Sequence, residues 1–127
     1  MVDSLGIVIS SRVEPANVSD QWGGKMLLSG IRTFFPNLRL IYADRGFAGD
    51  NFKQWANRDD YNIQIVKKEP ASAKEKFKIS AKRWIIERTF GWFNRYRRLA
   101  KYYEAKVHTS EVLIDLVVIR IMLNRLF

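Results

Sequence analysis

The sequence predicts an α/β fold in a single domain, and three observations support this. The chain has 127 residues, a length that suits one domain. Segments rich in β-branched residues alternate with segments of helical periodicity, and this implies a sheet with a mainly parallel portion. Hydrophobic residues make up 47% of the chain and cysteine is absent, so an apolar core forms without disulfides or thiolate metal sites.

The first part of the chain is expected to form a hairpin, a helix and a strand. Residues 6–13 are rich in β-branched side chains and predict a strand. A turn is expected to join this strand to a short arm at residues 1–3. Apolar spacing predicts a helix over residues 21–35, with several possible N-caps at residues 17–20. Residues 38–43 form a nearly continuous apolar run, which is typical of a buried central strand.

The second part is expected to contain three helices and one more strand. A short helix follows Asp50, and alternation at residues 61–66 predicts a strand. A long helix is expected from near Ser80 to Tyr103. Residues 112–126 are apolar on nearly every side and predict a largely buried final helix, capped by Thr109 or Ser110.

The charge of the chain favours a polyanionic partner. The formal net charge is +9, which is more typical of nucleic-acid binding than of an ordinary soluble domain, the alternative explanation. A solvated helix face would also explain the basic run near residue 97, yet its cations suit phosphate and its tyrosines can stack on bases. No secretory signal is found, and the most apolar stretch is too short and too charged to span a membrane. The candidate DNA-binding residues are Arg45, Arg83, Arg95, Arg97, Arg98 and Lys101.

Two acidic residues are the candidate metal ligands. Asp44 follows the apolar strand, at a position where sites form in parallel sheets, although aspartate is also common in turns. Glu87 lies among bulky apolar residues, and on a helix Gly91 would leave space beside it. The alternative for Glu87 is an exposed ion pair with Arg83. Carboxylates from separate elements suit Mg²⁺ or Mn²⁺, which prefer hard oxygen ligands.

The motifs ADRGF at residues 43–47 and RWIIERTFGWFNRYRRLAKYYE at residues 83–104 resemble those of the DDE transposases of bacterial insertion sequences. The resemblance implies a ribonuclease-H-like fold and two-metal cleavage and joining of double-stranded DNA, at transposon ends and target, in the bacterial cytoplasm. It assigns Asp44 as the second catalytic aspartate and Glu87 as the catalytic glutamate. Arg83 matches the arginine of the glutamate signature, whereas Ser80 and Asn94 depart from its tyrosine and lysine.

The family's first aspartate lies upstream of the stretch that resembles VDSLG. We therefore expect residues 1–127 to be the carboxyl-terminal part of the catalytic domain, with a mixed sheet that lacks its first strand. Such a chain would be inactive or impaired alone, and it would be poorly stable or would borrow a strand from another copy as a homo-oligomer. The alternatives are a non-catalytic basic DNA-binding or assembly module and a decayed transposase remnant.

Overall fold

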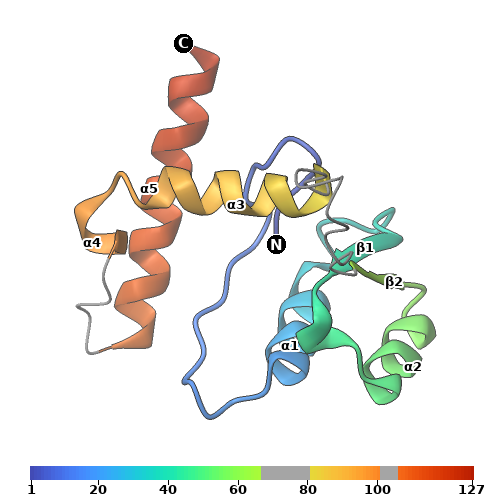
Figure 1. Cartoon of the computed structure of the whole chain (residues 1–127). Helices are drawn as coiled ribbons and strands as arrows, with labels where there is room; N and C mark the ends of the chain where they lie inside the picture. Colours follow the sequence, from blue (N-terminus) through green and yellow to red (C-terminus); the bar gives the residue numbers. More distant parts are fainter. Residues whose placement is uncertain (67–80, 101–105) are drawn as a thin grey trace, which may run out of the picture. The chain divides into compact units, whose positions relative to one another are not determined.

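The computed structural model describes residues 1–66, 81–100 and 106–127, in a mixed arrangement of helices and a small sheet. The chain divides into two compact units (Figure 1). One unit is Pro15–Ser80, and the other combines Met1–Glu14 with Ala81–Phe127. We call them the sheet unit and the helical unit.

The sheet unit begins with helix α1, Asp20–Ile31. Ser19 is its N-cap, and the Ser19 hydroxyl accepts a hydrogen bond from the Trp22 amide at 3.3 Å. This confirms the cap that was expected among residues 17–20, since a serine oxygen satisfies an amide left unpaired in the first turn. The helix ends earlier than predicted, and the amides of Phe34 and Phe35 bond to the Ile31 carbonyl in the turn that follows.

Strands β1, Leu40–Ala43, and β2, Asn62–Ile65, form a parallel pair, which confirms the predicted parallel sheet. The short 3₁₀ helix η1, Arg45–Phe47, and helix α2, Asp50–Arg58, connect them (Figure 1). The expectation that the strand predicted over residues 38–43 is buried and central is wrong for the described residues. Only β2 pairs with it there, so alternate side chains of β1 remain exposed.

The core of the sheet unit lies where the helices meet the strands. Phe52 and Tyr61 are the largest fully buried side chains, and the Tyr61 hydroxyl donates to the Leu28 carbonyl at 3.3 Å. Gly24 on α1 allows close approach, because a methyl group there would lie 2.7 Å from the Phe47 ring. The buried apolar residues are Leu28, Ile31, Phe52, Ala56, Tyr61 and Ile63.

The helical unit begins with a tight turn instead of the predicted strand over residues 6–13. Asp3 Oδ1 accepts hydrogen bonds from the amides of Leu5 at 2.9 Å and Ile7 at 2.8 Å. An isolated antiparallel bridge joins Val2 to Val8, which retains only the expected pairing of the short first arm. A strand needs a neighbouring strand with which its backbone forms continuous hydrogen bonds. Among the described residues, residues 6–13 have no such neighbour, so their β propensity alone did not produce a strand.

Three helices complete the helical unit: α3, Ala81–Phe93; α4, Arg97–Ala100; and α5, Val107–Leu126. The prediction of one helix through Tyr103 is wrong, because a turn after Phe93 separates α3 from α4. The final helix begins earlier than predicted, after Lys106, so neither Thr109 nor Ser110 is its cap. It is also not largely buried, since Ser110 is its single buried residue.

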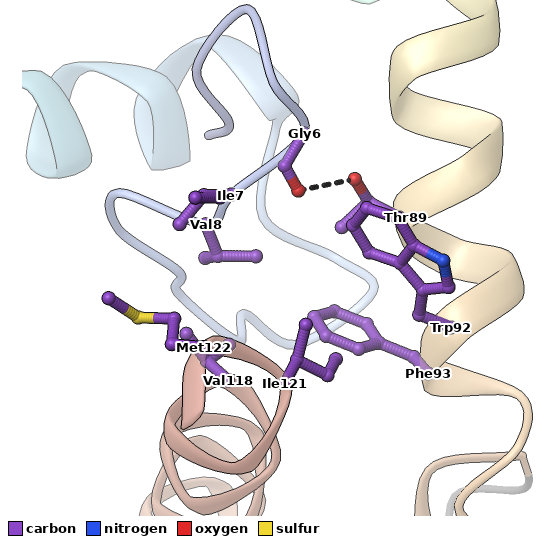
Figure 2. A pocket seen from close by; sticks show the side chains of 9 residues that line it. All are labelled: Gly6, Ile7, Val8, Thr89, Trp92, Phe93, Val118, Ile121 and Met122. Carbon is purple, nitrogen blue, oxygen red and sulfur yellow. Dashed lines mark hydrogen bonds between the residues drawn. The ribbon is translucent and has the colours of Figure 1, made fainter. Parts of the chain in front are cut away.

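The N-terminal turn, α3 and α5 enclose a small, mainly apolar pocket (Figure 2). Thr89 on α3 is 4% exposed, and its hydroxyl lies 2.9 Å from the Gly6 carbonyl oxygen and 3.0 Å from that of Ile85. Gly6 has φ +79°, and a methyl group there would lie 3.1 Å from the Thr89 hydroxyl. Glycine therefore suits both the backbone conformation and the close contact. The other lining residues are Ile7, Val8, Trp92, Phe93, Val118, Ile121 and Met122.

None of the helices in the described part of the chain combines the length and the apolar character that a membrane crossing requires.

Candidate functional site

Asp44 lies at the carboxyl edge of the parallel pair. It directly follows β1 and is the N-cap of η1, where its Oδ1 accepts a hydrogen bond from the Gly46 amide at 3.0 Å. The Val66 amide donates to the Ala43 carbonyl at 2.8 Å, so the pairing of the two strands continues to this edge. The Asp44 side chain is exposed and is bound by the Gly46 amide alone among the described residues. One carboxylate oxygen is thus oriented while the other can accept a ligand.

A second carboxylate, which the sequence did not single out, lies beside Asp44. A methyl group on Gly46 would clash with Asp20 Oδ2 and would lie 3.2 Å from Asp44 Oδ1. The two carboxylates therefore approach each other across a glycine that leaves room for both. The sequence explains Asp20 as an acid in the first turn of α1, where its negative charge interacts favourably with the positive end of the helix dipole. Only the packing of α1 near η1 brings it to Asp44.

Glu87 lies on α3 and points to solvent. Its Oε1 accepts a hydrogen bond from Arg83 Nε at 2.7 Å, and the two side chains are 50% and 52% exposed. The bulky residues around Glu87 do not bury it, because Trp84 and Phe90 are themselves substantially exposed. The space expected beside Gly91 is present, since a methyl group there would meet no atom within 4 Å.

Arg88, the residue after Glu87, also had no assigned role in the sequence. Its guanidinium carbon lies 4.5 Å from the Trp84 ring centre and 5.0 Å from that of Trp92, four residues away on either side. Its Nη2 donates to the Leu5 carbonyl at 2.5 Å. The hydrogen bonds from Arg88 to Leu5 and from Thr89 to Gly6 hold the helix turn that carries Glu87 against the N-terminal turn. The sequence signal for this stacking was the presence of a tryptophan four residues before and four residues after an arginine on a predicted helix.

The two predicted metal ligands belong to different units, Asp44 to the sheet unit and Glu87 to the helical unit. Within the described ranges, no three acidic or histidine residues gather as a metal-binding group. The chemistry of each side chain still suits a hard divalent cation, because an exposed carboxylate offers anionic oxygen.

The predicted DNA-binding arginines are exposed wherever they are described. Arg45 lies in η1 next to Asp44, and Arg83 pairs with Glu87. Arg95 occupies the turn after α3, and Arg97 and Arg98 begin α4. Lys101 lies outside the described residues.

Comparison with known proteins identifies a family for this chain. Residues 41–124 match the family described as transposase DDE domain, and the match includes both candidate acids. No curated protein and no solved structure matches the chain. Because the matching region covers more than half of the sequence, the chain belongs to the transposase DDE domain family.

Proposed function

We propose that this chain is part of a transposase that cleaves and joins DNA strands at insertion-sequence ends, with Asp44 and Glu87 as ligands of Mg²⁺ or Mn²⁺. The observation that carries the proposal is the family match over residues 41–124, which contains both acids. We further propose that the parallel pair belongs to a ribonuclease-H-like sheet, and that residues 1–127 are the carboxyl-terminal part of that catalytic domain. The position of Asp44 at the carboxyl edge of β1 supports this assignment.

The two carboxylates fit a divalent cation by their accessibility and their chemistry. Asp44 keeps one oxygen on the Gly46 amide and exposes the other, and Glu87 is held by a guanidinium that a competing cation can displace. A bound divalent metal would supply activation of an attacking oxygen and stabilisation of the leaving oxygen. The chain itself positions these carboxylates: Asp44 follows strand β1 at its carboxyl edge, and Glu87 lies on helix α3, which is hydrogen-bonded to the N-terminal turn.

Exposed arginines support binding of the DNA backbone. Guanidinium groups form paired hydrogen bonds with phosphate, and each phosphate that is neutralised adds to the salt dependence of binding. We propose that Arg45 and Arg83, which neighbour the two acids, contact DNA near the reacting phosphate. Arg95, Arg97 and Arg98 would extend this contact.

The metal assignment is tested by titrating the 127-residue chain with Mn²⁺ and measuring free metal by electron paramagnetic resonance. Asp44→Asn and Glu87→Gln should each weaken Mn²⁺ binding by about tenfold or more, since each removes an anionic ligand. Asp50→Asn is the matched control for the first variant, because Asp50 is an exposed acid of the same unit. Unchanged affinity in both variants would contradict the assignment.

The catalytic assignment is tested by Mg²⁺-dependent nicking of terminal-repeat DNA, together with DNA binding at several salt concentrations. Because residues 1–127 are expected to be inactive or impaired alone, weak nicking that is lost in Asp44→Asn and in Glu87→Gln would support it, whereas robust nicking that is lost in Glu87→Gln would show that another acid completes the site. The competing function, a non-catalytic DNA-binding module, predicts binding that ignores both acids and weakens when Arg95, Arg97 and Arg98 are neutralised.

A further inference from the structure

Asp20 lies beside Asp44, although it is neither of the two acids that the family motifs assign to the metal site. It belongs to the first turn of α1, which Ser19 caps through the Trp22 amide, so its position at the start of the helix is fixed. Asp20 also lies outside residues 41–124, the region that matches the transposase family. A role for Asp20 therefore has to come from the packing of α1 against the segment that follows β1.

Two glycines after β1 receive the first turn of α1. A methyl group on Gly46 would clash with Asp20 Oδ2. A methyl group on Gly49 would lie 2.8 Å from Gln21 Oε1. Neither glycine has a positive φ, so the backbone conformation does not require glycine at either position. Both positions instead provide the space that the side chains of Asp20 and Gln21 occupy.

The two carboxylates meet without a positively charged side chain between them. A single point beside Gly46, the place of the added methyl group, lies within 3.2 Å of both Asp20 Oδ2 and Asp44 Oδ1. The Gly46 amide donates to Asp44, whereas no hydrogen bond or ion pair from the described residues reaches the Asp20 side chain. Like charges this close repel each other, and a shared cation removes the repulsion. Both side chains are exposed, so a cation can reach them from solvent.

We propose that Asp20 is a further residue of the metal centre and binds the same divalent cation as Asp44. This rests on the metal-ligand role proposed for Asp44. Carboxylates from two separate elements supply the anionic oxygens that Mg²⁺ and Mn²⁺ prefer, and water commonly completes the coordination of Mg²⁺. Asp44 can bind a cation while it accepts the Gly46 amide, because an ionised carboxylate has about four acceptor sites. Asp20 holds the cation at the carboxyl edge of β1 from the side of α1.

The test is a Mn²⁺ titration of the 127-residue chain, with free metal measured by electron paramagnetic resonance. Asp20→Asn should weaken Mn²⁺ binding about tenfold, because it removes an anionic ligand while it keeps the shape of the side chain. Asp50→Asn is the matched control and should leave the affinity unchanged, since Asp50 is also an exposed acid in the first turn of a helix of the same unit. Asp20→Asn combined with Asp44→Asn should weaken binding by less than the product of the two single effects, because both act on one ion.

Urea unfolding separates a metal ligand from a structural residue. Without metal, Asp20→Asn should keep the wild-type unfolding midpoint, and the wild-type chain should gain more stability than the variant from the same Mn²⁺ concentration. A variant that unfolds more readily without metal yet binds Mn²⁺ with wild-type affinity would overturn the proposal, because Asp20 would then only support the packing of α1. If Asp44→Asn and Glu87→Gln weaken Mn²⁺ binding and Asp20→Asn does not, the role of Asp20 alone fails. A wild-type chain that binds no Mn²⁺ would contradict the role of Asp20 and the proposed metal site together.

Discussion

Replacing Glu87 by glutamine distinguishes a metal ligand from a surface ion pair. The structure provides a matched partner variant, Arg83→Gln, which removes the same 2.7 Å contact from its other side. Both side chains are about half exposed, and such pairs contribute about 0.3–0.5 kcal/mol at most. The arginine precedes the glutamate, which is the weaker order on a helix. Either substitution should therefore lower the unfolding free energy by about 0.5 kcal/mol or less, or roughly 1–3 °C in melting temperature.

The same two substitutions should change metal affinity in opposite directions. Glu87→Gln removes an anionic ligand and should weaken Mn²⁺ binding about tenfold or more. Arg83→Gln removes a positive charge that competes for Glu87 Oε1 and repels the cation. At a separation of about 6 Å in screened water, this repulsion is roughly 0.6 kcal/mol, so Mn²⁺ should bind about threefold more tightly.

The assay combines urea unfolding with a Mn²⁺ titration at physiological ionic strength. Equal, small changes in unfolding free energy together with opposite changes in affinity would support the metal-ligand assignment. Affinities that fall equally in both variants would show that the ion pair itself matters. A loss of more than about 1.5 kcal/mol of stability in Glu87→Gln alone would show that the carboxylate is structural.

Three substitutions test the packing that supports the site, each by urea unfolding. Gly24→Ala should destabilise the chain by about 1–3 kcal/mol despite its better helix propensity, because the new methyl would lie 2.7 Å from the Phe47 ring; a gain in stability would contradict this contact. Thr89→Val should cost about 1–3 kcal/mol, since it leaves the buried Gly6 carbonyl unpaired; a neutral effect would show that water reaches that oxygen. Gly91→Ala should stabilise α3 by up to about 1 kcal/mol, as no atom lies within 4 Å of the added methyl; a loss of stability would reveal an unrecognised contact.

Features set by neighbouring residues were predictable from the sequence. The Ser19 cap, the short helix near Asp50 and the two parallel strands all follow from local propensity and hydrophobic spacing. The position of Asp44 directly after a strand also follows from these patterns. The metal-binding role of Asp44 and Glu87 stays a prediction, because it was inferred from the family motifs.

Features that depend on partners distant in the chain could not be predicted in this way. Residues 6–13 have strand propensity, yet a strand needs a neighbour, and a turn with a single bridge formed instead. Asp20 approaches Asp44 only because α1 and η1 pack together at Gly46.

The final helix shows the division most clearly. The sequence by itself predicted a helix over residues 112–126 that is apolar on nearly every side. Only the tertiary structure decided which side is covered, because the pocket formed with the N-terminal turn and α3 takes the face of Val118 and Ile121. Hydrophobic spacing records how much apolar surface a helix carries, whereas the partner that covers each face is set by contacts made elsewhere in the chain or on another molecule.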